Sequence, residues 1–222
     1  MGEAIGQSLP VAVGVLISPM PIVAVVLMLL TPRARSNAAA FLIGWVAGIA
    51  VLGTVVLLIA DGLAGGDDGP PAWAAWLKLV LGVLLLLLAA NNWRGRPRGD
   101  AEPPTPGWMR AVDGFTPVKA LGLAVLLGAI NPKNLLLVVS GAAAIASATT
   151  DGTARAVALA VFVVIASIGV AAPLVIYLAT GDRAAALLGD LRGWMVRYNA
   201  AIMTVLLAVI GAKMLGDGIA GL

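Results

Sequence analysis

Apolar residues in this chain form long uninterrupted runs, unlike the alternating pattern of strands. Read with a window of about 20 residues, the sequence divides into six such runs. They cover approximately Leu9–Leu30, Ala38–Ala60, Trp73–Asn92, Ala120–Ile145, Ala156–Ala179 and Trp194–Leu215. Each run is long enough for a helix to cross the hydrocarbon layer of a bilayer. The pattern predicts an all-α polytopic membrane protein with six transmembrane helices.

Composition excludes a soluble fold and narrows the chemistry. Hydrophobic residues make up 61% of the chain and charged residues 11%, against roughly 25% charged in an ordinary globular domain. The chain has no Cys and no His, so it lacks thiolate and imidazole metal ligands and the commonest general base. No Asp or Glu lies in the interior of a predicted span. We therefore expect no metal, no cofactor and no enzymatic activity, and the net charge of +3 is too small to argue for nucleic-acid binding.

Positive charges are distributed unevenly among the connections between the predicted spans. The first, third and fifth connections hold most of the 14 Lys and Arg residues, namely Arg33, Arg35, Arg94, Arg96, Arg98, Arg110, Lys119, Arg183, Arg192 and Arg197. The opposite side receives Arg155 and Lys213. Because cytoplasmic loops are enriched in Lys and Arg, this bias predicts that the odd connections are cytoplasmic and that both termini lie outside.

The order of the spans indicates an internal duplication. Three spans in residues 1–92 and three in 119–222 flank a connection at 93–118 that is rich in Pro and Arg, and Ile17–Ile22 aligns with Ile130–Leu135. Because each half has an odd number of spans, the two halves must lie in opposite orientations across the membrane. The sequence thus predicts two inverted three-helix repeats, as in many secondary transporters. The central connection, Arg94–Pro117, is expected to be an extended cytoplasmic linker without a core of its own.

Two aligned motifs place prolines in the middle of the first and fourth spans. The first motif contains Ser18, Pro19 and Pro21, and the second contains Asn131, Pro132, Lys133 and Asn134. Proline removes a backbone donor and clashes with the preceding turn, so both helices should kink or unwind there. Irregular backbone inside a membrane is tolerated where it is buried or lines a cavity. Breaks at corresponding positions of two repeats predict a substrate-binding site.

Lys133 lies near the centre of its predicted span. An ammonium group at that depth costs roughly 2.5–3.5 kcal/mol on insertion scales, and the spans offer no carboxylate to pair with it. A water-filled cavity, carbonyl oxygens of the broken helices or an anionic substrate group could compensate the charge. The positive ends of the two interrupted helices would add to it. The residues therefore favour a phosphate, sulfate or carboxylate group as ligand.

The two motifs and the segment between them resemble a known family. Ser18-Pro19-x-Pro21 and Asn131-Pro132-Lys133 are similar to signatures of the LysE transporter superfamily. The stretch from Trp108 to Leu135 more closely resembles the actinobacterial GAP family of peptidoglycolipid- and sulfolipid-addressing proteins. The resemblance implies an inverted fold of three plus three helices in the plasma membrane and a role in moving glycolipids toward the cell surface.

Three functions are compatible with these features. The first is transport of a lipid or glycolipid with an anionic headgroup, by alternating exposure of a site between the broken helices. The second is LysE-like export of an amino acid or another small solute. The third is a non-transporting scaffold that recruits lipid-synthesis or export proteins through Arg94–Pro117. A groove open laterally to the bilayer would favour the first, and a small-residue pair, Gly44 and Gly48, would permit close helix packing or a homodimer.

Overall fold

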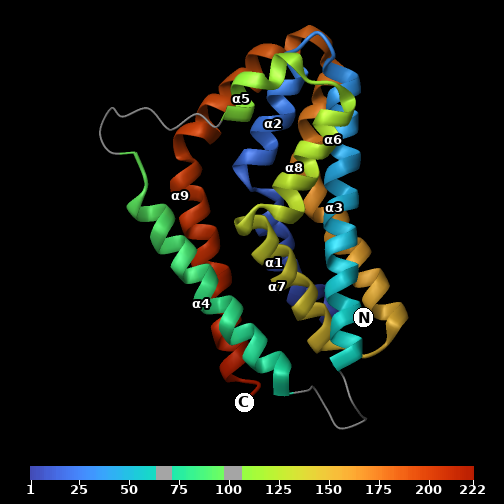
Figure 1. Ribbon diagram of the computed structural model, residues 1–222, viewed down its shortest axis with the longest axis vertical. Coiled ribbons are helices and arrows are strands. Elements are labelled where there is room, and N and C mark those ends of the chain that lie inside the picture. Colours follow the sequence, from blue (N-terminus) through green and yellow to red (C-terminus); the bar gives the residue numbers. More distant parts are fainter. Residues whose placement is uncertain (64–71, 98–106) are drawn as a thin grey trace.

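The computed structural model describes residues 1–63, 72–97 and 107–222, and the regular structure in these ranges is helical. Figure 1 shows an elongated bundle with the long helices roughly along one axis. The elements in chain order are α1 (Gly2–Leu16), α2 (Pro19–Leu29), α3 (Ala34–Leu63), α4 (Ala72–Arg94), α5 (Gly107–Ala111), η1 (Val112–Gly114), α6 (Pro117–Val125), η2 (Leu126–Ile130), α7 (Pro132–Ala148), α8 (Gly152–Thr180), η3 (Gly181–Arg183) and α9 (Ala184–Ile219). The short segment η2 is a π-helix.

Four helices are long and apolar enough to cross a membrane, and two more spans are broken. The helices α3, α4, α8 and α9 each qualify alone. The helices α1 and α2 meet at an angle of 47°, and the continuous α6–η2 segment meets α7 at 61°. Counting each bent pair as one span gives six spans. The predicted all-helical membrane fold with breaks in the first and fourth spans is confirmed.

The helices pack in a reciprocal pattern. The helices α1, α2, α3 and α4 of the first half correspond to α6, α7, α8 and α9 of the second. The contact of α1 with α8 corresponds to that of α6 with α3. The contacts of α2 with α9 and α8 correspond to those of α7 with α4 and α3. The two remaining equivalents, α4 and α9, form an extensive pair with each other, which lies to one side of the bundle in Figure 1. Exchanging the two halves preserves these contacts, as an inverted repeat requires, whereas the extensive contact of α1 with α7 has no counterpart of similar extent between α6 and α2. The exact boundaries of the repeats, at 92 and 119, stay a prediction.

Glycines bring the unbroken helices close to the breaks. A Cβ atom on Gly169 of α8 would overlap the carbonyl oxygen of Leu16, at the end of α1. On α3, a Cβ on Gly44 would lie 2.5 Å from the Leu121 oxygen of α6. The predicted close packing of α3 on a neighbour is thus found inside the chain. Because Gly44 is used for this internal contact, it gives no argument for the homodimer.

The central connection differs from the predicted linker. Residues 98–106 lie outside the described part, but α5 and η1 follow them and bury Met109 and Val112 in the main hydrophobic core. The buried side chain of Asn37, in α3, donates from Nδ2 to the Phe115 carbonyl oxygen at 3.1 Å. The prediction of a linker without a core was therefore wrong for residues 107–117. The apolar residues of this segment were too few for a hydropathy window to detect, yet Met109 and Val112 pack on the main hydrophobic core.

The last helix is longer than the predicted span Trp194–Leu215. Helix α9 has 36 residues, about 54 Å at 1.5 Å per residue, which exceeds the hydrocarbon thickness of roughly 30 Å. Figure 1 shows its first part lying across one end of the bundle before the helix descends. Polar residues such as Asp190 and Arg192 lower the hydropathy of this part without interrupting the helix. Hydropathy therefore located the span and missed the helical extension.

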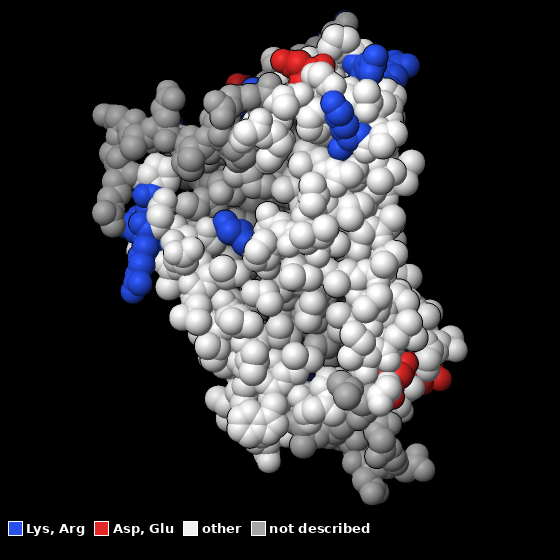
Figure 2. Space-filling view, in the orientation of Figure 1, with Lys and Arg blue, Asp and Glu red and all other residues white. Residues whose placement is uncertain are grey.

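The charged side chains are segregated along the bundle. On the face shown in Figure 2, most basic side chains lie in the half that carries α5 and the start of α6. In the described part, the two ion pairs join Arg155 to Asp61 and Lys213 to Asp217. The spans themselves remain almost free of charge, as the hydropathy pattern predicts.

Candidate functional site

The first break lies between α1 and α2, at the motif that begins with Ser18. Ser18 is the N-cap residue of α2, with φ −61° and ψ 117°, and its side chain is 4% exposed. Pro19 is the first residue of α2, where a missing N–H costs nothing because the first turn of a helix has no internal acceptor. Pro21 removes a second donor from the same turn. The start of α2 therefore offers fewer amide donors than an ordinary helix N-terminus.

The second break repeats this geometry at Asn131. Its backbone has φ −58° and ψ 123°, within a few degrees of Ser18, and Pro132 again begins the following helix. The Asn131 side chain accepts a 3.1 Å hydrogen bond from the Lys133 backbone N–H. This N-cap hydrogen bond orients the first turn of α7. The predicted correspondence of the two motifs is thus found in the backbone as well as in the sequence.

The π-helical segment η2 prepares the second break. The Asn131 N–H donates to the Leu126 oxygen at 2.7 Å, five residues back. The Leu127 oxygen instead accepts from Nδ2 of Asn134, at 2.8 Å. Asn134 is 3% exposed, and its Oδ1 atom has no hydrogen-bond partner in the described part of the protein. The motif therefore satisfies the freed Leu127 carbonyl with Asn134, whereas the sequence suggested such carbonyls as partners for Lys133, and it leaves one buried amide oxygen without a partner in the described part.

Lys133 has a partner that the sequence did not indicate. Its Nζ atom donates a 2.6 Å hydrogen bond to Oδ1 of Asn92, in the last turn of α4. The expectation that backbone carbonyls, water or substrate alone would compensate this ammonium was therefore incomplete. An amide oxygen is neutral, and no carboxylate forms an ion pair with Lys133 among the described residues. Lys133 accordingly has a neutral amide, and no carboxylate, as its side-chain partner in the described part of the protein.

The Asn92 side chain has a second polar atom, which is buried. Because lysine can only donate, the hydrogen bond fixes the Asn92 amide with Oδ1 toward Lys133 and Nδ2 on the other side. This Nδ2 is buried and has no partner among the described residues. A buried amide donor without a partner costs about 1–3 kcal/mol. Asn92 therefore accepts from Lys133 and keeps a buried N–H donor without a partner among the described residues.

The pair of α4 and α9 connects the two breaks. The Ser18 hydroxyl lies 3.9 Å from the sulfur of Met203, on α9. The next residue, Thr204, has its hydroxyl 3.5 Å from the Ala89 oxygen of α4, one turn before Asn92. The first break thus contacts α9, the second break contacts α4, and these two helices pack together. The structure places both motifs against one helix pair.

A second polar centre lies at the opposite end of α7. The buried Arg155 donates from Nε to the Thr149 oxygen at 2.6 Å and from one terminal nitrogen to the Ala146 oxygen at 2.9 Å. Its other terminal nitrogen pairs with Asp61, at the end of α3. Arg155 therefore satisfies carbonyls at the end of α7 and joins three helices. Sequence reasoning treated it as a loop charge, because nothing local distinguishes a buried arginine from an exposed one.

The partner of Lys133 gave only a weak signal in the sequence. Asn91 and Asn92 are consecutive amides at the end of an apolar run, a position where an interfacial role is the usual interpretation. In the described ranges, no three His, Cys, Asp or Glu residues gather into a group that could hold a metal ion. The chemistry at the second break is therefore that of one cation and amide groups.

Comparison with known proteins found one match. A family model described as Sap, sulfolipid-1-addressing protein, matches residues 9–220. No curated protein and no solved structure matches the chain. The matched range includes both broken spans and the α4–α9 pair.

Proposed function

The chain belongs to the sulfolipid-1-addressing protein (Sap) family, and we propose that it moves an anionic lipid or glycolipid across the plasma membrane. The family description implies a role in glycolipid transport or export. In this proposal the headgroup binds between the two broken helices, and the site opens alternately to the two sides of the membrane. Ser18, Pro19, Pro21, Asn131, Pro132, Lys133 and Asn134 form the site, with Asn92 as an added member.

The observation that carries the proposal is the hydrogen bond from Lys133 to Asn92. The bond supplies a neutral acceptor, so among the described residues the ammonium charge has no counter-ion in a span where that charge is costly. An anionic headgroup would supply the missing charge, and its oxygens could accept from Lys133 Nζ. Charge-assisted hydrogen bonds of this kind are roughly twice as strong as neutral ones. The site would bind a cationic solute poorly.

The buried oxygen of Asn134 adds a preference within the anionic lipids. This Oδ1 can only accept, so it needs a donor such as a hydroxyl group. A sugar carries hydroxyl donors beside any sulfate, phosphate or carboxylate group. A glycolipid headgroup therefore carries both an anionic group for Lys133 and hydroxyl donors for the Asn134 oxygen.

The orientation of the protein follows the charge bias. The connection containing Arg33 and Arg35, the Arg94–Pro117 connection and the start of α9 face the cytoplasm in this proposal. Both termini and the Arg155–Asp61 pair then face outside. The α4–α9 pair contacts both breaks and takes one helix from each repeat. It is the interface at which the two repeats would rock relative to each other.

A flip assay in proteoliposomes tests the proposal. The purified protein is reconstituted with fluorescent lipids that carry an anionic or a zwitterionic headgroup, and inner-leaflet label is measured by its protection from an impermeant quencher. We expect movement of the anionic lipid to require Lys133, so that Lys133→Met abolishes it and Lys133→Arg retains part of it. The matched control is Lys119→Met, since Lys119 is an exposed residue in the first turn of α6.

If Lys133→Met moved the anionic lipid at the wild-type rate, the proposed mechanism would be wrong. Efflux of labelled lysine, arginine or a neutral amino acid, without lipid movement, would instead establish small-solute export. Scaffolding predicts a third outcome, in which deleting the Arg94–Pro117 connection abolishes glycolipid export in cells while Ser18, Asn131 and Lys133 can be replaced without effect.

A further inference from the structure

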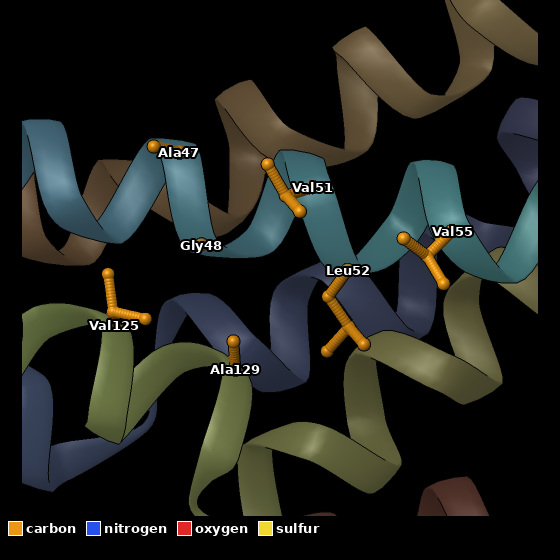
Figure 3. A pocket seen from close by; sticks show the side chains of 7 residues that line it. All are labelled: Ala47, Gly48, Val51, Leu52, Val55, Val125 and Ala129. Atoms are coloured by element: carbon orange, nitrogen blue, oxygen red, sulfur yellow. The ribbon is translucent and has the colours of Figure 1, made fainter.

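An apolar pocket lies in the middle of the membrane-spanning part of the chain. It has a volume of about 340 Å³ and opens between α3 and the α6–η2 segment. Its lining residues are Ala47, Gly48, Val51, Leu52, Val55, Val125 and Ala129, and Figure 3 shows their side chains along the space between the two segments. Every lining residue is apolar, and Val51 is 63% exposed on the rim. We call this feature the α3 groove.

The α3 groove begins where a close helix contact ends. At Gly44 the two segments touch, because a Cβ there would lie 2.5 Å from the Leu121 oxygen. One turn further, a Cβ on Gly48 would lie 3.5 Å from the Val125 Cα and 3.6 Å from the Ala129 Cβ, which are ordinary contacts. The small side chain of Ala129 then leaves the space open. The groove is thus built by small residues flanked by exposed valines.

The other repeat packs tightly at the corresponding place. Leu16 and Ala129 are equivalent, because each lies three residues before the first proline of its motif. Gly169 is so close to Leu16 that a Cβ would overlap the Leu16 oxygen, whereas Gly48 faces Ala129 with room for a methyl group. The first repeat is closed at the place equivalent to the groove, so the groove is not a consequence of the packing that the two repeats share. It exists where η2 is π-helical, and π-helical turns are frequent at functional sites.

The position of the groove determines the chemistry of its occupant. Gly48 lies midway along α3, a span of 29 residues from Ala34 to Gly62. At this depth the surrounding medium is hydrocarbon. A water molecule needs two to four polar partners to be held in a cavity, and the lining offers none. A ligand that fits this groove would therefore be an alkyl chain.

The groove is also continuous with the proposed headgroup site along the chain. Ala129 lines the groove and lies two residues before Asn131, which caps the helix that carries Lys133. The same π-helical segment therefore lines the apolar groove at Ala129 and leads along the chain into the polar break at Asn131. From this placement we infer that the α3 groove binds an acyl chain of the transported lipid. This inference rests on the proposed function.

Photo-crosslinking tests where the acyl chain binds. The probe is an anionic lipid with a diazirine midway along one acyl chain, reconstituted with the wild-type protein, and a zwitterionic lipid with the same chain is the comparison. We expect the anionic probe to label the α3 and η2 residues of the groove more strongly than the zwitterionic probe. Equal labelling by both lipids would mean that the groove holds bulk lipid, which would overturn the inference.

Two substitutions close the groove by different routes. Gly48→Leu fills its floor, and Ala47→Phe fills it from an exposed position on α3. Val164→Phe is the matched control, since Val164 is 64% exposed on α8, outside the groove. Both groove variants should lose the crosslink and slow the movement of the long-chain anionic lipid roughly tenfold, whereas the control should retain both. Because Ala47 is exposed, Ala47→Phe adds its ring without displacing a packed side chain, so its effect does not depend on how Gly48→Leu folds.

The outcomes separate this inference from the proposed function. Suppose that Lys133→Met does not move the lipid and that the groove variants move it at the wild-type rate. This result would overturn the acyl-chain site and leave the headgroup site supported. Binding of a short-chain lipid with the same headgroup should persist in Ala47→Phe and disappear in Lys133→Met. A disulfide-linked dimer formed by Val51→Cys would show that a second copy covers the groove and would also overturn the inference.

Discussion

Lys133 on α7 and Asn92 on α4 are joined by a 2.6 Å hydrogen bond between Nζ and Oδ1, across 41 positions of sequence. The bond links the broken helix of the second half to the last helix of the first half. It compensates a membrane-embedded ammonium group with a neutral oxygen and leaves the positive charge in place. The ammonium group that we propose as the headgroup site thus belongs to one half of the chain and is positioned by a residue of the other half.

Replacing Asn92 by Asp should block this site without disrupting it. An aspartate would sit beside the Lys133 ammonium and form an ion pair, and it would repel an anion at about 4 Å by up to about 4 kcal/mol at an effective dielectric constant of 20. We expect Asn92→Asp to remain folded and to lose movement of anionic lipid by at least roughly tenfold. The flip assay measures the rate, and size-exclusion chromatography checks the fold.

An exchange of the two side chains provides the control for this prediction. The double variant Asn92→Lys with Lys133→Asn restores one ammonium and one amide at the same place. It should recover part of the lipid movement that Lys133→Asn alone loses. Full activity of Asn92→Asp would be incompatible with an anion bound at Lys133.

Arg155 should contribute more to stability than its ion-pair partner does. Arg155→Met leaves the Ala146 and Thr149 oxygens without their donors, and charged hydrogen bonds of this kind are worth about 1.5–3 kcal/mol each. Asp61 is 55% exposed in its side chain, so Asp61→Asn should cost less than about 1 kcal/mol. Thermal unfolding in detergent should show a clearly lower midpoint for Arg155→Met than for Asp61→Asn. Equal midpoints would contradict this assignment.

The two glycines beside the breaks should respond oppositely to the same substitution. Gly169→Ala places a methyl group on the Leu16 oxygen and forces α8 away from α1, which should cost about 1–3 kcal/mol. Gly48→Ala meets ordinary contact distances and removes the backbone freedom of glycine, so stability should stay the same or rise slightly. The unfolding midpoints of the two variants, measured side by side, check the difference in packing between the two repeats.

The predicted orientation can be read with single cysteines, since the chain has none of its own. Ser36 and Gly152 are exposed at opposite ends of the bundle, in connections that the charge bias assigns to the cytoplasm and the outside. An impermeant maleimide added to intact cells should label Gly152→Cys and spare Ser36→Cys until the membrane is opened. The reverse pattern would invert the orientation that we propose.

Individual residues show how far sequence analysis could reach. Pro19 and Pro132 were sufficient to locate both breaks, because the loss of an amide donor acts on the residues next to it. Lys133 could be singled out because its charge contrasts with the apolar run around it. The partner of Lys133, the burial of Arg155 and the packing of Met109 could not be predicted, since each depends on which distant surface lies opposite.

The sequence by itself determined that the chain is a helical membrane protein, where its spans lie and where two of them break. These properties follow from local hydropathy and local backbone chemistry, which act within one or two helical turns. Only the tertiary structure decided that Asn92 meets Lys133, that α4 and α9 contact both breaks, and that Gly169 closes one helix contact while Gly48 leaves the other open. These relationships depend on how helices from the two halves are arranged in space. The local sequence around each residue does not specify which distant residue lies opposite it.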